Sequence, residues 1–308
     1  MTDVRTGSTH LAQPASSAAP TTSTTATVRL AILGAGVMGE TVLSGLLRAG
    51  WDAADIVATD RRPDREVELR QTYGIRMLSN AEAAAAADTV VLVVKPQDMR
   101  DLLSEIADVL RPGTLVVSLA AGVDTALIEG QLPDGTAVVR VMPNTPAQVD
   151  EGMAAISPGS HSDQDHLDRV SRILSATGRV VTVPERYQDA VTAISGSGPA
   201  YLFFVVEAMI DAGVHLGLPR DTATELVVQT MLGSAKLLRE TGVHPTVLRE
   251  RVTSPGGTTT AAVRQLEERA VRAAFMTAME AARDRSRELA EAARQSAPGA
   301  GRAPGRPE

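Results

Sequence analysis

The residues with the clearest chemical signature form a glycine-rich loop at 34–39, with the sequence Gly-Ala-Gly-Val-Met-Gly. The loop directly follows an apolar run at 28–33 and directly precedes a helical stretch at 40–49. In a strand–loop–helix unit of this spacing, the first glycine permits a tight turn, the second lets the backbone approach a pyrophosphate, and the third allows close helix–strand packing. The helix N-terminus then offers N–H groups to phosphate. This order predicts a dinucleotide-binding site and disfavours a glycine-rich turn without a ligand.

An acidic residue and two arginines follow the next apolar run, at 56–59. Asp60 lies 21 residues beyond Gly39, where a carboxylate accepts hydrogen bonds from the adenosine ribose and favours NAD. Arg61 and Arg62 come directly afterwards, and a guanidinium at this point can bind the 2′-phosphate of NADP. A turn of solvated charges without a ligand is the third interpretation. The two cofactor signals conflict, so the sequence leaves NADH and NADPH open.

Two further strand ends carry residues suited to a cofactor. The apolar run at 89–94 ends at Lys95, and the run at 115–119 continues into the small residues of 120–122. Ligands of open α/β sheets lie across the carboxyl ends of the strands. Small residues there leave room for a nicotinamide ring, and Lys95 is either a cofactor contact or an ordinary strand-end lysine.

Hydroxyl groups and glycines gather in two loops of the second half. Residues 195–199 read Ser-Gly-Ser-Gly-Pro and open a predicted helix at 200–213, and residues 252–260 open what the sequence predicts to be the final long helix. One Ser or Thr is enough to cap a helix, whereas the second loop carries five hydroxyls and two glycines. A helix N-terminus of this kind suits a small carboxylate. We therefore expect a substrate site there.

The elements that must position these residues divide the chain into two architectures. From 28 to 185, short apolar runs alternate with helix-length segments, which indicates a parallel sheet with crossover helices. From 186 to 292 the strand signals vanish and an all-helical domain is expected. Residues 1–27 have the composition of a disordered leader, and residues 293–308 that of a disordered tail. The expected strands are 28–33, 56–59, 89–94, 115–119, 138–142, 153–157 and 179–183.

Composition excludes several classes of function. Only 2% of the 308 residues are aromatic, which argues against single-stranded nucleic-acid binding through stacked bases. The net charge of −7 argues further against a phosphate-backbone partner. The chain has no cysteine, so disulfides, thiolate nucleophiles and cysteine-ligated metals are excluded. We also expect no membrane span, which needs about 18 consecutive apolar residues.

One predicted helix of the second half is apolar on nearly every face, at 201–211. Such a helix must be buried on all sides, and in a domain of this size that suggests helices contributed by a second subunit. Glu207, Asp211 and His215 share one stripe of it. Their spacing suits metal ligands, but a polar seam between packed helices is favoured, and no metal is assigned.

The order of these segments resembles that of the pyrroline-5-carboxylate reductase family. The resemblance covers about residues 28 to 290, and a Gly-x-Gly-x-x-Gly domain followed by SGSGPAY and then TSPGGTT is highly specific to it. The matching stretches are GAGVMG (34–39), VVKPQ (93–97), SLAAGV (118–123), RVMPNTPAQVDEGM (140–153), DAVTAISGSGPAYLFFVVEAMIDAGV (189–214), QTMLGSAKLL (229–238) and HPTVLRERVTSPGGTTTAAVRQLE (244–267).

The resemblance implies an α/β Rossmann-type dinucleotide-binding domain followed by an all-helical dimerisation domain. It implies NADPH- or NADH-dependent reduction of the cyclic imine Δ1-pyrroline-5-carboxylate to L-proline, the last step of proline biosynthesis, in the cytoplasm. The protein would be at least a homodimer, and some family members form rings of dimers. Thr259 matches the family's threonine that hydrogen-bonds the imine nitrogen, which makes it the expected catalytic residue.

The expected site residues follow from the motifs and the resemblance together. Those expected to bind substrate are Ser197, Gly256, Gly257, Thr258 and Thr259. Those expected to bind the cofactor are Leu33, Gly34, Ala35, Gly36, Val37, Met38, Gly39, Asp60, Arg61, Asn80, Val93, Val94, Lys95, Pro96, Leu119, Ala120 and Ala121.

Three positions depart from the family pattern. Val37 stands where many relatives have a polar residue, and the turn at 60–62 replaces a hydroxyl-rich turn common in NADPH-preferring members. Gly242 falls where some relatives place a glutamate near the substrate. Two other functions fit the same domain order: a catalytically silent nucleotide-binding regulatory protein, and a β-hydroxyacid dehydrogenase. The latter needs a catalytic lysine in the helical half, where Lys236 is the only lysine.

Overall fold

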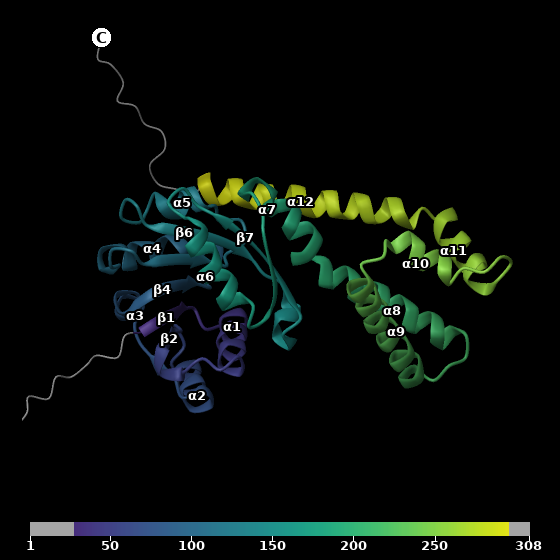
Figure 1. Cartoon of the computed structure of the whole chain (residues 1–308), viewed down its shortest axis with the longest axis horizontal. Coiled ribbons are helices and arrows are strands. Elements are labelled where there is room, and N and C mark those ends of the chain that lie inside the picture. The colour runs from purple at the N-terminus through teal and green to yellow at the C-terminus, as the bar shows by residue number, and fades with distance from the viewer. Residues whose placement is uncertain (1–27, 296–308) are drawn as a thin grey trace, which may run out of the picture.

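The computed structural model describes residues 28–295. The expected leader at 1–27 lies outside the described residues, as does most of the expected tail. The structure extends the last helix through Gln295, three residues into the segment expected to be tail. The described chain consists of a sheet-containing half and a helical half, which occupy opposite ends of the molecule (Figure 1).

The first half is built on one eight-stranded sheet with the order β3-β2-β1-β4-β5-β6-β7-β8. All neighbouring strands are parallel except β6 and β7, which are antiparallel. Strand β1 lies between β2 and β4, so the chain order reverses on its two sides, as in a dinucleotide-binding fold. The strands are β1 (Val28–Leu33), β2 (Ile56–Thr59), β3 (Arg76–Met77), β4 (Ala87–Leu92), β5 (Leu115–Ser118), β6 (Ala137–Met142), β7 (Gly152–Pro158) and β8 (Gly178–Thr182).

Helices cover both faces of this sheet because its central strands are apolar on both sides. Along β1, Leu30 and Ile32 join one buried cluster, whereas Ala31 and Leu33 join another, as expected when successive side chains point to opposite faces. The first cluster includes residues of α1, α2 and α6, and the second includes residues of α3, α4 and α5. These helices are α1 (Val37–Arg48), α2 (Pro63–Tyr73), α3 (Asn80–Ala86), α4 (Met99–Ile106), α5 (Thr125–Glu129) and α6 (Gln164–Leu174).

The strand predictions are confirmed with small shifts and two corrections. The short edge strand β3 was not predicted, because two residues carry no readable alternation. The expectation of a parallel sheet is wrong at β7, which runs antiparallel to β6. The physical reason is the short connection at 143–151: an antiparallel partner needs only a short turn, whereas a parallel one needs a crossover of a dozen or more residues.

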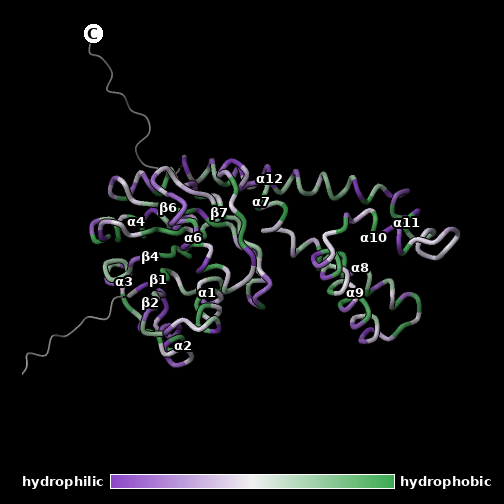
Figure 2. Tube along the Cα trace, viewed as in Figure 1, coloured by the Kyte–Doolittle hydropathy of each residue, from purple (hydrophilic) through white to green (hydrophobic). Residues whose placement is uncertain are grey.

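The second half is all helical, as predicted. Helix α8 starts beside the sheet and extends away from it, α9 to α11 lie remote from the sheet, and α12 runs back to the sheet-containing half (Figure 1). Hydrophobic residues occur along α8 and α9 as well as along strands such as β4 (Figure 2). The helices are α7 (Gln188–Val191), α8 (Gly198–His215), α9 (Arg220–Thr241), α10 (Pro245–Arg251), α11 (Thr258–Glu268) and α12 (Val271–Gln295), with a π-helical turn at Thr192–Gly196 before α8.

Polar contacts fix the end of α12 to α7 and to the loop after β5. The Ser286 hydroxyl donates to Asp189 at 2.8 Å, and Arg294 pairs with Asp124 at 2.7 Å. Gly122, which has a φ of +75°, lies beside Ala290. The last helix therefore ties the loop after β5 to the helical half of the same chain.

The segment Glu185–His215 is, by length and composition, long and apolar enough to cross a membrane. It contains charged residues such as Glu207 and Asp211, so it is not the run of about 18 consecutive apolar residues whose absence the sequence predicts. The segment is broken by the π-helical turn and by Pro199. Its most exposed apolar side chains include Phe203 and Phe204, at 68% and 72%.

Candidate active site

The glycine-rich loop is held against the ends of its neighbouring strands. Gly34 has a φ of +99°, and a side chain there would meet the Val93 carbonyl oxygen at 2.8 Å. The N–H groups of Gly34 and Ala35 donate to the Thr59 carbonyl oxygen at 3.2 and 2.8 Å. The loop is thus fixed by backbone contacts to the residues that end β2 and follow β4. Its sharp turn requires a glycine at its first position.

The other two glycines of the loop have different roles: Gly39 allows close packing, and Gly36 leaves the loop open to a ligand. A side chain on Gly39 would collide with the Gly34 carbonyl oxygen, whereas one on Gly36 would meet nothing within 4 Å. Gly36 is the N-cap of α1 and makes no side-chain capping bond. A Cβ on Gly36 would project into open space. The free N–H groups in the first turn of α1 are therefore open to a ligand, as in a phosphate-binding site.

A threonine at the end of β2 and an asparagine at the start of α3 hold this loop in place. The Thr59 hydroxyl donates to Asn80 Oδ1 at 2.6 Å, and Asn80 Nδ2 donates to Glu105 at 2.9 Å. The Gly34 N–H also approaches the Thr59 hydroxyl at 3.3 Å. Sequence reasoning missed Thr59, although its place as the last residue of β2, beside Asp60, was a usable signal.

A cavity of about 870 Å³ opens in front of the loop. That volume lies within the range of small-molecule and cofactor sites. Of the residues expected to bind cofactor, those that line the cavity are Gly34, Gly36, Asp60, Arg61, Asn80, Val93, Val94 and Lys95. Other lining residues include Thr59, Arg62, Glu66, Glu82, Asp98, Asp101 and Glu105.

The remaining expected cofactor residues lie outside this cavity. Leu33, Ala35 and Gly39 are buried beneath the loop, and Val37 is 69% exposed at the start of α1. Met38 and Pro96 are also absent from the lining. Leu119 and Ala120 are buried after β5, and Ala121 is exposed beside them.

The charged residues of the turn after β2 form ion pairs. Arg62 Nε approaches Asp60 at 3.1 Å, and the Arg62 backbone N–H also donates to this carboxylate at 3.0 Å. Arg61 donates to both carboxylate oxygens of Asp98, at 3.3 and 3.1 Å. Burial opposes ionisation of Asp60, but the hydrogen bonds from Arg62 outweigh it, so the pKa of Asp60 lies below its usual value.

The hydroxyl-rich loop at 252–260 opens α11, which corrects the prediction that it opens the last long helix. A break at Ala270, with a φ of +55°, separates α11 from α12. Gly257 is the N-cap of α11 and makes no side-chain capping bond, and the Thr260 hydroxyl donates to the Ser254 carbonyl oxygen at 2.6 Å. Gly256, with a φ of +71°, and Thr258 are exposed, and Thr259 is half-buried. Local hydrogen bonds therefore fix the shape of the loop, which remains open to solvent.

The loop that contains Ser197 lies instead against the sheet. The Asn144 side chain follows β6, where it accepts from the Met153 N–H at 2.8 Å and donates to the Ser195 carbonyl oxygen at 3.1 Å. The Ser197 N–H closes the π-helical turn by donating to the Thr192 carbonyl oxygen. Turns of this kind often occur at functional sites. Asn144 was not singled out from the sequence, although it lies in the Met-Pro-Asn-Thr-Pro stretch.

One chain does not bring all of these residues together. Ser197 begins α8 near the carboxyl end of β6, which faces the same edge as the glycine loop. Thr259 lies on α11, at the end of the molecule remote from the sheet (Figure 1). The structure therefore places the cofactor cavity and the Thr259 loop far apart within one chain.

Other polar groups of the helical half form ordinary surface contacts. Asp211 pairs with Arg220 at 3.0 Å, so that member of the stripe with Glu207 and His215 has a partner in the neighbouring helix. Lys236 pairs with Glu240 at 3.7 Å and is 70% exposed. It lies in the middle of α9 and does not line the cofactor cavity, so it does not suit the catalytic lysine that a β-hydroxyacid dehydrogenase needs.

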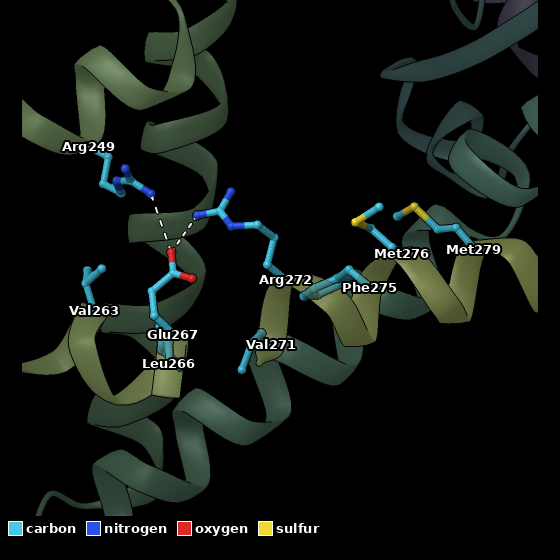
Figure 3. Close-up of a pocket in the computed structure, with 9 residues that line it drawn as sticks. All are labelled: Arg249, Val263, Leu266, Glu267, Val271, Arg272, Phe275, Met276 and Met279. Carbon is cyan, nitrogen blue, oxygen red and sulfur yellow. Dashed lines mark hydrogen bonds and ion pairs between the residues drawn. The ribbon is translucent and has the colours of Figure 1, made fainter. Parts of the chain in front are cut away.

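The helical half also carries an apolar groove of about 440 Å³ between α10, α11 and α12. Phe275, Met276 and Met279 line one end, and Arg249 and Arg272 converge on Glu267 at the other (Figure 3). The Arg272 hydrogen bond is the main cause that holds the pKa of Glu267 below its usual value. This groove has no glycine loop and lies away from the dinucleotide cavity.

The fold and the cavity define the class: a dinucleotide-binding oxidoreductase with a helical second domain. The family description "NADP oxidoreductase coenzyme F420-dependent" matches residues 29–122, and "Pyrroline-5-carboxylate reductase dimerisation" matches residues 185–289. A Corynebacterium melassecola pyrroline-5-carboxylate reductase is 47% identical over 264 residues, covering 84% of this chain and 98% of its own. A Mycobacterium tuberculosis pyrroline-5-carboxylate reductase is 43% identical, covering 85% and 96%. The chain belongs to the pyrroline-5-carboxylate reductase family.

Solved structures agree with this assignment. A Coxiella burnetii pyrroline-5-carboxylate reductase matches with a TM-score of 0.82 at 38% identity, covering 85% of this chain and 98% of that one. The Plasmodium falciparum pyrroline carboxylate reductase with NADP bound matches with a TM-score of 0.77 at 29% identity, covering 85% and 98%. The apolar segment Glu185–His215 falls within the residues that match the dimerisation family.

Proposed function

We propose that this chain reduces Δ1-pyrroline-5-carboxylate to L-proline with NADH or NADPH, as the last step of proline biosynthesis in the cytoplasm. The single observation that carries the proposal is the joining of a glycine-loop cavity to a helical half that matches the reductase dimerisation family. The residues of the cavity fit a dinucleotide, because Gly36 leaves the backbone open where a pyrophosphate would approach. The nicotinamide, when bound, supplies the hydride.

The chain's own residues would bind the cofactor, orient the substrate and polarise the imine. Gly34 and Gly36 would hold the phosphates, while Asp60 and Asn80 would face the adenosine end of the cofactor. Reduction of the imine adds a hydride to carbon and needs a proton or hydrogen bond at nitrogen, since a neutral imine is a weak electrophile. We assign this hydrogen bond to the Thr259 hydroxyl. Ser197, Gly256, Gly257 and Thr258 would help to seat the substrate, with backbone N–H groups at the start of α11 binding its carboxylate.

We further propose that each active site is built from two copies of the chain. Hydride transfer requires the substrate to touch the nicotinamide, and in one chain the Thr259 loop lies at the far end from the cofactor cavity (Figure 1). The exposed apolar face of α8 supplies the surface on which two copies would join. The partner's copy of the Thr259 loop would then complete the site beside the carboxyl edge of the sheet.

The assay that tests the function follows the loss of absorbance of the reduced nicotinamide with pyrroline-5-carboxylate as substrate. We expect imine-dependent oxidation of at least one cofactor. A protein that binds both cofactors but oxidises neither with this imine would be the silent regulatory protein instead. Cofactor reduction with 3-hydroxy acids would indicate the dehydrogenase.

The assembly larger than a dimer is also a proposal, based on the family's rings of dimers. Light scattering on the purified protein measures the mass, and a mass that stays at two chains over the accessible concentrations would exclude the ring. We propose no nucleic-acid or membrane partner, in line with the net charge of −7. Retention of the protein by anionic vesicles or by duplex DNA would contradict this.

A further inference from the structure

We propose that this chain prefers NADH to NADPH, and that Asp60 sets the preference by presenting a carboxylate where the adenosine ribose would bind. The inference deepens the proposed function, because it concerns the cofactor of the same site. The Plasmodium falciparum relative has NADP bound, so the fold itself accommodates a 2′-phosphate. Discrimination must therefore come from the residues around the ribose position.

The placement of Asp60 is fixed by the phosphate loop. The Gly34 and Ala35 N–H groups donate to the carbonyl oxygen of Thr59, the residue immediately before it. The Asp60 side chain is only 9% exposed, so its carboxylate is held beside the loop and does not swing freely in solvent. An acidic residue in this position accepts hydrogen bonds from the ribose hydroxyls of NAD.

The two arginines that could bind a 2′-phosphate are already paired with carboxylates. Arg62 is bound to Asp60 through its side chain and its backbone, and Arg61 makes a two-point contact with Asp98. A guanidinium that turned to a phosphate would leave a carboxylate of the same cavity unpaired. Each arginine is therefore half of an ion pair that a 2′-phosphate would have to break.

The charge of the whole cavity points in the same direction. Six carboxylates line it, those of Asp60, Glu66, Glu82, Asp98, Asp101 and Glu105, against three cations. The third cation, Lys95, follows β4, which lies on the opposite side of β1 from β2 and Asp60. Asp60 is ionised at neutral pH, since its pKa lies below the usual aspartate value. A 2′-phosphate would thus approach a charge of its own sign.

The test measures binding of NADH and NADPH by nicotinamide fluorescence, in the absence of any imine. We expect wild-type protein to bind NADH about tenfold more tightly than NADPH or better, as one like-charge contact implies. Asp60→Asn should reduce this ratio about tenfold, because it keeps the shape of the side chain and removes its charge. Asp98→Asn should strengthen NADPH alone by releasing Arg61. The matched control Asp101→Asn removes a carboxylate from the same cavity and should change the ratio much less.

The wild-type ratio decides the proposal even if a variant fails to fold. Tighter binding of NADPH by the wild type, or an unchanged ratio in a folded Asp60→Asn protein, would overturn it. A protein that reduces the imine but binds NADPH more tightly retains the proposed function and loses only this inference. A protein that binds NADH more tightly but never reduces the imine retains this inference and loses the proposed function.

Discussion

The two halves of this chain differ in how completely they bury their apolar residues. In the sheet-containing half, Leu30, Ile32 and Leu33 are fully buried between helices on both faces. In the helical half, Phe203 and Phe204 are 68% and 72% exposed on α8. The first half completes its own core, whereas the second presents a face that only another surface can cover.

The same contrast holds for the two candidate ligand sites. The glycine loop is fixed by backbone hydrogen bonds and by side chains that a single chain supplies, such as Thr59 and Asn80. The Thr259 loop is shaped by local bonds alone, with Thr260 bound to Ser254. This contrast is the basis of our proposal that one chain is enough to bind the cofactor, whereas imine reduction needs two.

The largest expected effect comes from a charge on the exposed face of α8. Phe203→Asp should cost about 2–4 kcal/mol of association free energy, as loss of an aromatic anchor does at interfaces. Dimer and reductase activity should disappear together, while NADH or NADPH binding persists. Sedimentation measures the first and fluorescence titration the last. Val67→Asp is the matched control, since Val67 is 50% exposed on α2 of the other half; loss of the dimer in the control would remove the distinction between the halves.

A substitution in the glycine loop should have the opposite effect to Phe203→Asp: cofactor binding should be lost and the dimer kept. Gly39→Val forces a side chain against the Gly34 carbonyl oxygen, which should lower the free energy of unfolding by about 1–3 kcal/mol and abolish cofactor binding. Gly36→Ala meets nothing within 4 Å, so it should weaken binding while leaving thermal stability unchanged. Equal losses of stability in both variants would show that the loop is not packed as described.

Removal of the proposed catalytic hydroxyl should spare both dimerisation and cofactor binding. Thr259→Ala is expected to lower kcat/KM for the imine by about a hundredfold, the usual scale for losing one positioned donor. Thr259→Ser keeps the hydroxyl and should recover most of the activity. Wild-type kinetics in a folded Thr259→Ala protein would end the role assigned to this residue.

The smallest expected effect is at the bridge between the two halves. Asn144→Ala leaves the Met153 N–H and the Ser195 carbonyl oxygen without this partner, at a cost of about 1–3 kcal/mol in stability. KM for the imine should rise several-fold with cofactor affinity unchanged. Asn144→Asp keeps the acceptor for Met153 but loses the donor to Ser195, so it separates the two bonds. If it behaves as wild type in KM, Ser195 is not positioned through Asn144.

Much of this contrast could be predicted from the sequence, because it rests on local signals. Runs of Val and Ile mark the strands, and the spacing of the glycines after β1 marks the phosphate loop. The apolar helix at 201–211 predicts a second subunit. The direction of β7 was not predicted, because an apolar run does not show which way its strand points. The short connection at 143–151 was the signal, since a parallel neighbour needs a longer crossover.

The site itself was harder to predict, because it depends on distance in space. Sequence order places Ser197 and Thr259 in one helical domain, but nothing in it says that they lie at opposite ends of that domain. The pairing of Arg61 with Asp98 joins residues on different loops, so the balance of charge around Asp60 is visible only in three dimensions.

The most direct test of the two-copy active site combines two inactive variants in one dimer. Gly36→Asp should abolish cofactor binding, and Thr259→Ala should lower kcat/KM for the imine about a hundredfold. If the Thr259 loop serves the partner's cofactor cavity, mixed dimers purified through two tags contain one intact site and should show about half of the wild-type activity. Mixed dimers that remain as inactive as either parent would show that each chain uses its own Thr259, and would contradict the account.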